Sequence, residues 1–506
     1  MAAAIGIAVV GAVGVAAQPD RGGSMRSAGG QLAVGYTTER ALAAALRTTH
    51  AVVVHRLTAL HVVELRARDS GRLARTLRTA PGIRFVERPS ARTSAAEPGV
   101  TLASFSPRAV WEWQYRAVHE DAVPAAVLRA ASSLQIAVID TGADLTAPDL
   151  AAKSPGAYNT RTGTSDVRDS NGHGTFVASL AAGSVTNGDG ISGAGGDVQL
   201  LVVKSGSNGG SFTDMDEAAG IVYAVDHGSK ILNLSVGGPT TSATERRAIE
   251  YAVSHGVLVV AAVGNEYAMG NPVEYPAALL QPVGSNGVGG AGLAVTASTT
   301  SGERAAFANS GTWVSLAAPG EDVFGALSEL SSPVQYPRSP LPGALSGVYG
   351  YASGTSFAAP QVSGAAALVW AANPSLTAQQ VAQILKETAS GAGSWTPGLG
   401  FGVLDVAAAV ARAQAGDPGV LLSGSRVHGR ERLTWGGDAA RYSLSLSVDA
   451  GPAQTVLAST ARTSMSVTLT RGHLYQFTVA ALDGSGVATS TSAPLTVVLA
   501  AARSRR

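Results

Sequence analysis

The sequence predicts a three-part chain whose main part is an α/β domain built on a doubly wound, mostly parallel sheet. Between residues 134 and 410, strand-like runs that are apolar throughout alternate with helical segments. Strands without a polar face are buried on both sides, which is typical of a parallel sheet covered by helices. The five predicted strands are 134–139, 198–203, 231–234, 257–262 and 293–296. In such sheets, ligands bind beyond the carboxyl ends of the strands.

The composition indicates a globular chain and excludes several chemistries. Hydrophobic residues make up 45% and charged residues 14% of the 506 residues, and the formal net charge is +1, so we expect no nucleic-acid partner. The absence of cysteine excludes disulfides, thiolate metal sites and a cysteine nucleophile. A chain of this length is too long for a single core, so about two to four domains are expected.

The N-terminus predicts export. Residues 2–17 form an apolar run that ends in small residues, which is typical of a signal peptide (residues 1–17) cleaved after Ala17, and hence of a secreted protein. The run lacks a preceding basic segment, and the alternative is a loosely attached N-terminus. The apolar run favours secretion. No later run reaches the length of a membrane span.

A small α+β unit is predicted next, over residues 31–90. Its order is β-α-β-β-α-β, as in a ferredoxin-like fold, with strands at 32–36, 51–56, 61–66 and 83–87 and helices at 39–47 and 72–79. Residues 89–100 are rich in Ser, Ala, Pro and Thr and predict an exposed linker that a protease could cut.

The C-terminal part, residues 420–500, predicts an all-β sandwich. Short strands are separated by Gly, Asp and Ser turns, and no segment has a convincing helical pattern. The predicted strands are 433–435, 442–448, 464–469, 475–482 and 495–499.

Ser356 is the main candidate for catalysis. It lies in Gly354-Thr355-Ser356-Phe357-Ala358-Ala359-Pro360, at a junction between a loop and an apolar helical run. The first turn of a helix leaves backbone N–H groups without helical partners, so the serine N–H points outward beside an accessible hydroxyl. Such a serine becomes a nucleophile when a base removes its proton and a third group holds that base.

Three upstream residues could complete this arrangement, although each is an ordinary turn residue when taken alone. Asp140 directly follows a buried strand, where a carboxylate can orient a histidine. His173, flanked by glycines, opens a helical run. Asn265 follows another buried strand, and its amide could donate to the oxyanion that forms when a carbonyl is attacked. All four side chains are expected at one edge of the sheet.

The sequence around these residues, in the order Asp, His, Asn, Ser, resembles the subtilisin-like serine proteases. The matching stretches are Val138-Ile139-Asp140-Thr141-Gly142, His173-Gly174-Thr175, Ile231-Leu232-Asn233-Leu234-Ser235-Val236-Gly237-Gly238, Gly264-Asn265 and residues 354–360. The resemblance implies a peptidase domain over residues 108–412. Phe357 stands where the family usually has methionine, and we expect it to alter packing and leave the chemistry unchanged.

The resemblance implies a role for each candidate. Ser356 would be the nucleophile, His173 the general base and then acid, and Asp140 the group that orients His173. Asn265 and the Ser356 N–H would form the oxyanion hole. No catalytic cofactor is implied.

The family also holds a polypeptide substrate as an added strand between two backbone segments. The substrate-binding residues implied here are Gly209, Gly210, Ser235, Val236, Gly237, Ala262 and Gly264. The pocket before the scissile bond would have small, apolar walls without an evident acid, which favours an apolar or aromatic side chain. The loop 328–346 is longer than usual before the serine, and we interpret it as a solvated insertion and not as a rim of the site.

Further expectations concern a metal and the flanks. Asp149 and Asn187 match positions that ligate structural calcium in many relatives, although both are equally typical of turns. Residues 31–90 would be an inhibitory propeptide that binds its own active site, with maturation within 90–107. Residues 420–500 would be a fibronectin type III-like domain, with Trp435 in its core and Tyr475 as its tyrosine corner, which could bind a surface or another protein.

Three alternatives are weaker. A catalytically silent, peptide-binding relative would usually lack one of the four catalytic positions, and all four are present. An α/β-hydrolase esterase requires G-x-S-x-G, and Ala358 occupies the place of the last glycine. A carboxyl-type serine peptidase uses glutamate as its base, and His173 in its full motif argues against it. The sequence therefore predicts a secreted, self-processing serine endopeptidase.

Overall fold

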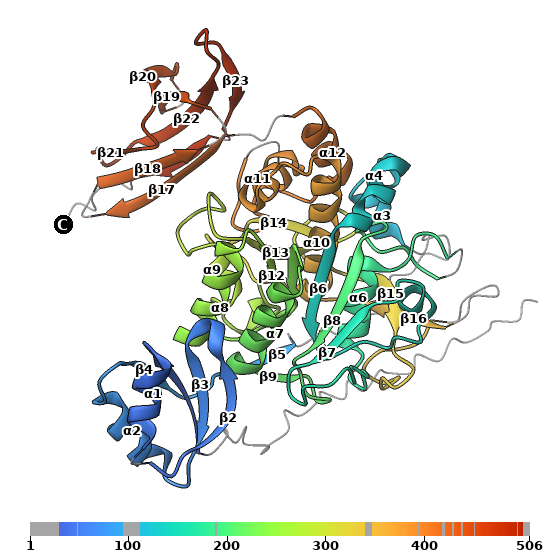
Figure 1. Cartoon of the computed structure of the whole chain (residues 1–506). Helices are drawn as coiled ribbons and strands as arrows, with labels where there is room; N and C mark the ends of the chain where they lie inside the picture. The colour runs from blue at the N-terminus through green and yellow to red at the C-terminus, as the bar shows by residue number, and fades with distance from the viewer. Residues whose placement is uncertain are drawn as a thin grey trace, which may run out of the picture.

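The computed structural model describes residues 30–47, 49–94, 112–187, 190–339, 347–391, 394–416, 420–427, 430–436, 439–449, 451–492 and 494–498 (Figure 1). The predicted signal peptide and residues 95–107 of the predicted maturation segment lie outside these residues. The described chain has an N-terminal unit, a central domain and a C-terminal β region.

A seven-stranded sheet forms the centre of the molecule, and all its neighbouring strands are parallel. Its order is β14-β13-β12-β10-β6-β8-β7. The strands are β6 (Gln135–Asp140), β7 (Gly156–Asn159), β8 (Gln199–Lys204), β10 (Ile231–Leu234), β12 (Leu258–Ala262), β13 (Leu293–Ser298) and β14 (Leu316–Pro319). The five predicted strands are present. The sequence missed β7 and β14 because their four-residue segments contain no run of β-branched residues.

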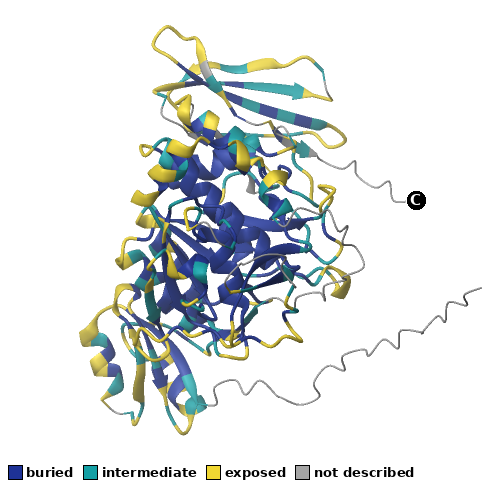
Figure 2. Ribbon diagram, turned by 90° about the vertical axis from the view of Figure 1, so that its right-hand side faces the viewer, coloured by how far each residue is buried: buried dark blue, intermediate teal, exposed yellow. Residues whose placement is uncertain are grey.

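Helices cover both faces of this sheet, as the apolar strands predicted. One face packs against α6 (His173–Ala182) and α10 (Thr355–Ala372), and the other against α7 (Asp214–Asp226), α8 (Ala243–Ser254) and α9 (Ala277–Leu280). Nearly all of α10 is buried, so it forms the middle of the core shown in dark blue in Figure 2. The remaining helical segments are α3 (Trp113–Ala117), η3 (Glu120–Ala122), α4 (Ala125–Ala130), η4 (Ala131–Ser133), α5 (Pro148–Ala151), η5 (Tyr267–Met269), α11 (Ala378–Thr388) and α12 (Val406–Gln414).

Two small antiparallel sheets lie outside the central one. In the first, β5 (Ala91–Ser94) pairs on one side with β9 (Ser211–Thr213) and on the other with β11 (Val236–Gly237). In the second, β15 (Val323–Leu327) pairs with β16 (Val348–Ala352). The first sheet ties the end of the N-terminal region to the central domain.

The N-terminal unit has the predicted order of strands and helices. It contains β1 (Gln31–Tyr36), α1 (Glu39–Leu46), β2 (Val52–Leu57), η1 (Thr58–Leu60), β3 (Val62–Arg66), α2 (Ser70–Arg78) and β4 (Ile83–Glu87). The antiparallel sheet has the order β2-β3-β1-β4. One of its faces packs against α1 and α2, and the other places Ala33, Leu57, Leu60 and Val62 in the same cluster as residues of α7 and α8. The unit therefore docks on the central domain through apolar contact.

The C-terminal region contains two β-sheets and a shared apolar core. Trp435 and Tyr475 are buried in that core, and the Tyr475 hydroxyl accepts from Thr470 N at 2.9 Å. The strands are β17 (Leu421–Val427), β18 (Arg430–Gly436), β19 (Arg441–Val448), β20 (Gln454–Thr460), β21 (Ser464–Val467), β22 (Leu474–Leu482), β23 (Ala488–Thr491) and β24 (Leu495–Val498). The sequence missed β17, β20 and β23.

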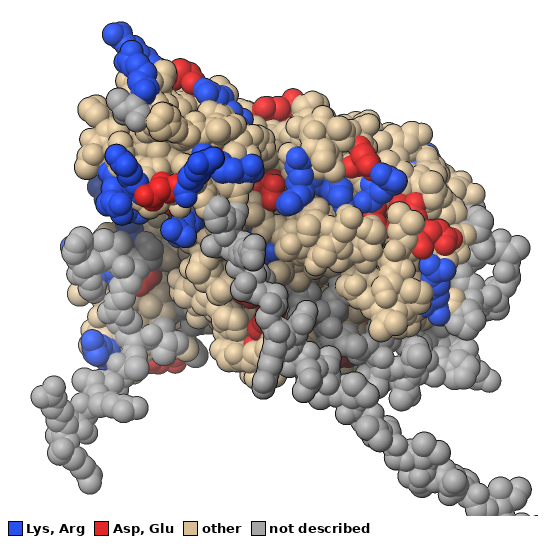
Figure 3. Space-filling view, turned by 90° about the horizontal axis from the view of Figure 1, so that it is seen from below, with Lys and Arg blue, Asp and Glu red and all other residues tan. Residues whose placement is uncertain are grey.

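The surface carries charges of both signs. On the face shown in Figure 3, basic and acidic side chains are interspersed in a band that crosses the molecule. Ion pairs also occur at the surface, such as Arg161 with Asp216 at 2.8 Å. Within the described residues, no helix combines the length and the hydropathy that crossing a bilayer would require.

Candidate active site

Asp140 and His173 meet at the carboxyl edge of the parallel sheet. Asp140 is the last residue of β6, and His173 is the first residue of α6. Asp140 Oδ1 lies 2.7 Å from His173 Nδ1, and both side chains are buried. In this geometry the carboxylate of Asp140 accepts a hydrogen bond from the N–H at Nδ1. The other ring nitrogen, Nε2, is then the one that can accept a proton. The sequence predicted this pairing.

The start of α6 is held by Asp169, a buried carboxylate that the sequence argument missed. Its Oδ1 accepts from Thr141 Oγ1 at 2.9 Å and from Gly172 N at 2.9 Å. Its Oδ2 accepts from Thr175 N at 2.8 Å and from Thr175 Oγ1 at 2.6 Å. Asp169 thus satisfies N–H groups of the first helical turn and fixes the segment that carries His173. An acidic residue shortly before a predicted helix was the available signal.

Ser356 lies in the first turn of α10, where the sequence placed it. Its Oγ donates to Ser235 O at 3.2 Å, and Ser235 Oγ donates to Ser356 O at 2.8 Å. Asn233 Nδ2 donates to Ser235 Oγ at 2.9 Å, and Ser363 Oγ donates to Asn233 Oδ1 at 2.9 Å. This buried network links the end of β10 to α10 at two points, Ser356 in its first turn and Ser363 two turns later. Asn233 lies in one of the matching stretches but had no predicted role, and Ser363 was not predicted as a site residue.

Phe357 fills the space between the two helices that carry His173 and Ser356. Its ring centroid lies 5.7 Å from that of His173 and 4.6 Å from that of Phe176, and its side chain is fully buried. The residue after Ser356 therefore packs directly against the imidazole. This is a packing role, as expected for the residue that replaces methionine.

Asn265 is anchored at the start of α10. Thr355 N and Thr355 Oγ1 both donate to Asn265 Oδ1 at 2.9 Å. These bonds identify Oδ1 as the acceptor end of the amide and Nδ2 as the donor end. A donor beside the first turn of α10 is the group that a developing oxyanion requires.

The predicted cleft is occupied by β5. Ser94 pairs with Val236, Thr93 pairs with Gly237, and Ser94 N donates to Gly210 O at 3.2 Å. Residues 91–94 therefore do not belong to an exposed linker, and that prediction was wrong for them. They form an extended strand because the edges of β9 and β11 supply hydrogen-bonding partners on both sides.

The seven predicted substrate-binding residues are distributed unevenly around β5. Val236, Gly237 and Gly210 contact it, and Ser235 contacts Ser356. Gly209 is exposed, and the strand beside β5 begins only at Ser211. On this edge of the cleft, Gly210 therefore lies beside β5 as predicted, whereas Gly209 does not.

The walls near Ala262 and Gly264 contain an acid that the sequence argument overlooked. Ala262 is buried at the end of β12. A Cβ on Gly264 would lie 3.0 Å from Glu274 Cδ, and a Cβ on Gly237 would meet Glu274 Oε2. Burial, followed by the neighbouring Glu266, raises the pKa of Glu274 to about 8. The premise that these walls lack an acid was wrong, so they no longer favour an apolar or aromatic substrate side chain.

The two predicted calcium ligands lie beside each other, and both carboxylate oxygens of Asp149 accept hydrogen bonds from protein groups. Asp149 Oδ1 accepts from Ile191 N at 2.9 Å and from Asn187 Nδ2 at 3.4 Å, and Asp149 Oδ2 accepts from Tyr349 Oη at 2.8 Å. In the part of the chain that the structure describes, no three acidic, histidine or cysteine side chains converge on a metal-sized site.

The loop after β15 is packed against α6. Tyr336 is buried and lies 6.5 Å from the Phe176 ring, and Ser328 Oγ donates to Asp169 O at 2.6 Å. Gly172, with φ of +100°, fits under this loop, because a Cβ there would lie 2.6 Å from Ser331. Ser328, Ser331 and Tyr336 are therefore buried anchors, which the interpretation as a solvated insertion did not foresee. Residues 329–330 and 332–335 are exposed, in agreement with it, and 340–346 lie outside the described residues.

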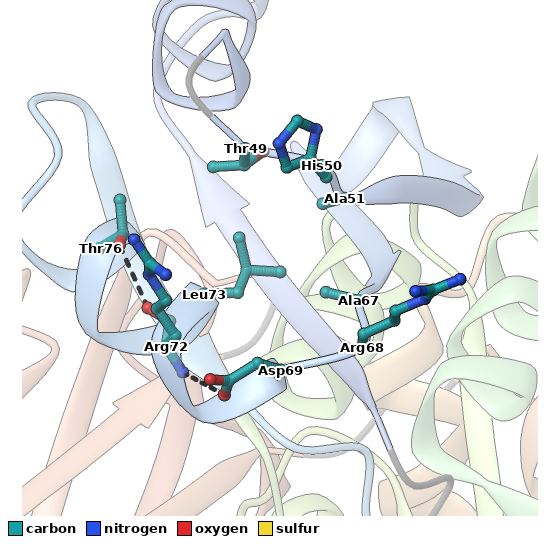
Figure 4. A pocket seen from close by; sticks show the side chains of 9 residues that line it. All are labelled: Thr49, His50, Ala51, Ala67, Arg68, Asp69, Arg72, Leu73 and Thr76. Atoms are coloured by element: carbon teal, nitrogen blue, oxygen red, sulfur yellow. Dashed lines mark hydrogen bonds between the residues drawn. The ribbon is translucent and has the colours of Figure 1, made fainter.

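One sizeable cavity lies apart from these residues. It has a volume of about 580 Å³ and lies in the N-terminal unit (Figure 4). Arg72 N donates to Asp69 Oδ1 at 2.8 Å along its wall. Its lining consists of Thr49, His50, Ala51, Ala67, Arg68, Asp69, Arg72, Leu73 and Thr76. None of the candidate catalytic residues lines it.

A buried Asp–His pair and a serine at a helix start, all at the carboxyl edge of one parallel sheet, define the site of a serine hydrolase. Comparison with known proteins makes this more specific. Residues 131–416 match the model of the subtilase family. The chain therefore belongs to the subtilase family of serine endopeptidases.

Individual relatives agree with this assignment. The chain is 35% identical over 272 residues to the thermophilic serine proteinase of Bacillus sp. (strain AK1), covering 53% of this chain and 60% of that protein. It is 33% identical to thermitase of Thermoactinomyces vulgaris over 53% of this chain and 86% of thermitase. It is 36% identical to subtilisin Savinase of Lederbergia lenta over 55% of this chain and 91% of that protein.

The fold is also similar to a solved structure. Fervidolysin from Fervidobacterium pennivorans, described as a keratinolytic enzyme related to subtilisin, matches with a TM-score of 0.66 and 19% identity. The match covers 90% of this chain and 87% of fervidolysin. At this level of identity the likeness concerns the fold alone.

Proposed function

We propose that this protein is a secreted, self-processing serine endopeptidase that cleaves peptide bonds through an acyl-enzyme on Ser356. The buried contact of 2.7 Å between Asp140 Oδ1 and His173 Nδ1 carries the proposal, because it supplies an oriented base at the edge of the sheet where Ser356 lies in the first turn of α10. The strand β5 supports it as well, since an extended segment of the chain already occupies the cleft beside that serine.

The chemistry uses only groups of this chain. The Ser356 hydroxyl turns from Ser235 O toward His173, and its Oγ attacks the scissile carbonyl carbon while its proton moves to His173 Nε2. The carbonyl electron pair moves onto the oxygen, which accepts hydrogen bonds from Asn265 Nδ2 and Ser356 N–H. The tetrahedral intermediate collapses, the C–N bond breaks, and His173 protonates the departing amine. Water then attacks the acyl-enzyme with the same proton transfers and releases the acid.

We further assign residues 31–90 as a ferredoxin-like inhibitory propeptide. Its sheet packs on α7 and α8, and β5 continues from it into the cleft. Ser94 is opposite Val236, the neighbour of Ser235, and Ser235 contacts Ser356, so β5 runs toward the nucleophile. These contacts support maturation after Ser94, inside the predicted segment 90–107.

We assign residues 420–500 as a fibronectin type III-like domain that binds a surface or another protein. The support is the two-sheet topology together with the Tyr475 hydroxyl, which is bonded to the backbone of Thr470 five positions earlier. Such a bond is typical of the tyrosine corner in β-sandwiches.

Labelling and N-terminal mass determination test the catalytic part of the proposal. We expect a fluorophosphonate probe to label the purified chain at Ser356 and the mature N-terminus to fall between residues 95 and 107. The variant Ser356→Ala should lose both labelling and maturation, because it lacks the nucleophile. The exposed Ser375 offers a matched control, and Ser375→Ala should behave as the natural chain does.

Two results would contradict the proposal. One is an Ser356→Ala chain that matures as efficiently as the natural chain when produced in the same host. The other is a natural chain that remains unlabelled although it is folded, which would favour a catalytically silent relative.

A further inference from the structure

Arg92, the second residue of β5, is a buried cation. Only 1% of its surface is exposed, although it belongs to a strand that enters the cleft from outside the central domain. Its Nη2 lies 2.8 Å from Glu245 Oε1, and its Nε lies 3.2 Å from the same oxygen. Its Nε also lies 3.6 Å from Glu217 Oε2. The guanidinium is thus held between α7, which carries Glu217, and α8, which carries Glu245.

The two glutamates depend on this arginine. Both are buried, and neither carboxylate oxygen of Glu217 has a hydrogen-bond partner among the described residues. Burial, followed by the Glu245 carboxylate, raises the pKa of Glu217 well above its ordinary range, and Arg92 opposes this rise. Buried carboxylates are costly without a counter-charge, and removing one partner of such a pair leaves the other uncompensated. The pocket is therefore built for a cation.

The cation comes from the segment that occupies the substrate cleft. Arg92 is opposite Phe212 of β9, and the next residue, Thr93, is opposite Gly237 of β11. A strand held by these two edges places one side chain in the pocket between α7 and α8, and the register decides which one. Once the N-terminal segment leaves, the glutamates stay with the central domain, and the next extended chain inserts its own side chain there.

We propose that Glu217 and Glu245 form a specificity pocket that selects polypeptide substrates with arginine at the position held by Arg92, two residues before the residue opposite Val236. This proposal rests on the proposed endopeptidase function. Arginine is preferred over lysine because the observed contacts use both Nε and Nη2, and Nη1 also donates to Ala91 O at 3.1 Å. Apolar side chains are disfavoured, because they leave the buried acids Glu217 and Glu245 without a donor and remove the contacts that the guanidinium makes with them.

Cleavage of a random peptide library by the natural, self-matured enzyme tests the proposal without any variant. Sequencing of the products should show arginine enriched at one fixed position on the N-terminal side of the cleaved bond, with lysine enriched less. Cleavage with no basic enrichment at any position overturns the specificity pocket and leaves the endopeptidase function standing. Failure to cleave any peptide, with Ser356 unlabelled, overturns the proposed function itself.

A matched pair of peptides then locates the selection. For the best-cleaved peptide, replacing its arginine with methionine should lower kcat/KM by at least ~30-fold, the lower end for removing one partner of a buried ion pair. In the double variant Glu217→Gln/Glu245→Gln, the kcat/KM values for the arginine peptide and the methionine peptide should become similar.

The control is Glu250→Gln, which neutralises an exposed acid on the same helix α8 and should keep the full preference. If the double variant and Glu250→Gln prefer the arginine peptide over the methionine peptide to the same extent, other residues select arginine and the proposed specificity pocket is wrong. Should the double variant fail to fold, the library result on the natural enzyme still decides the question.

Discussion

Single buried side chains hold the reactive groups of this enzyme in place. Asp140 fixes His173, Asp169 fixes the segment before it, and Asn233 and Ser235 fix the start of α10. Asp169, Asn233 and Ser235 have their hydrogen bonds inside the protein, whereas Asp140 Oδ2 has no hydrogen-bond partner among the described residues. Buried polar groups of this kind stabilise a single arrangement when they are satisfied and cost free energy when a partner is removed.

Asp169→Ala tests this dependence. The variant leaves the N–H groups of Gly172 and Thr175 without the carboxylate, so we expect the free energy of unfolding to fall by about 3 kcal/mol. Activity should fall as well, because His173 loses its fixed position. Urea denaturation in a Ser356→Ala background, which avoids self-digestion, measures the stability.

The control for this substitution is Asp166→Ala, three residues earlier. Asp166 is half exposed and pairs with Arg168 on the surface, so its removal should change stability little. Equal effects of the two substitutions would show that Asp169 has no special structural role.

Strand edges and helix ends join the N-terminal unit to the central domain. Two side chains accept hydrogen bonds from the first backbone N–H groups of α8. Ser242 accepts from Glu245 N. Glu87 of β4 accepts from Ala243 N at 3.0 Å and from Thr244 N at 3.1 Å. A carboxylate at a helix N-terminus is stabilised by the unsatisfied N–H groups and by the helix dipole. Glu87 therefore contributes to docking of the proposed propeptide.

Glu87→Ala should weaken that docking by about 10-fold or more, the effect expected for losing charge-assisted hydrogen bonds. The measurement is the initial rate at which a fluorophosphonate labels freshly processed enzyme, which should rise as the segment leaves the cleft sooner. Glu39→Ala removes an acid on α1 that pairs with Arg56 inside the N-terminal unit and is the matched control. An unchanged labelling rate in Glu87→Ala would contradict a docking role for this carboxylate.

In the molecule as a whole, we expect docking of the N-terminal unit to depend on pH. Burial, followed by the Asp216 carboxylate, raises the pKa of Glu64 in β3 from 4.5 to about 7, and Arg66 opposes this rise. The docked state thus binds a proton that a released segment would lose. Protonation of Glu64 therefore stabilises the docked state. This stabilisation is fully present below pH 4.5 and is lost as the pH rises through about 7. His55 lies opposite Glu64, and burial lowers its pKa. This group therefore has the opposite effect, and stabilises the docked state more at higher pH.

We therefore expect the N-terminal segment to leave the cleft faster as the pH rises from about 5 to 7.5. The ratio of labelling rates between the natural chain and Glu64→Gln, taken at each pH, removes the pH dependence of the catalytic groups. That ratio should increase with pH, because only the natural chain carries the titrating carboxyl. A ratio that stays flat over this range would contradict the role of Glu64.

Much of the fold and of the site could be predicted from the sequence, because those parts depend on local patterns. Apolar runs predicted five central strands, and motifs at strand ends predicted the Asp140–His173 contact. Features that depend on distant contacts could not be predicted in this way. Segment 89–100 is polar and small like a linker, and only the two edges of β9 and β11 make residues 91–94 a strand. The loop 328–339 has a loop-like composition, yet Tyr336 packs against α6.

The acids Glu217, Glu245 and Glu274 were missed for the same reason. Each lies in a helix or loop whose sequence gives no sign of the cleft, and only the folded chain brings them to it. Charge patterns along a sequence identify exposed helix faces more readily than pockets shared by several elements. Specificity was therefore the least predictable property of the site.

The pairing of β5 on both of its sides also predicts which substrates the enzyme would digest under the proposed maturation. With β5 gone, β9 and β11 are two separated strand edges, and a peptide must be fully extended over several residues to bridge them. Residues in a helix or inside a folded sheet already use their backbone groups elsewhere, so they cannot fill this gap without local unfolding. Target proteins should therefore be cut first at flexible termini and loops, and tightly folded proteins should resist until they are denatured.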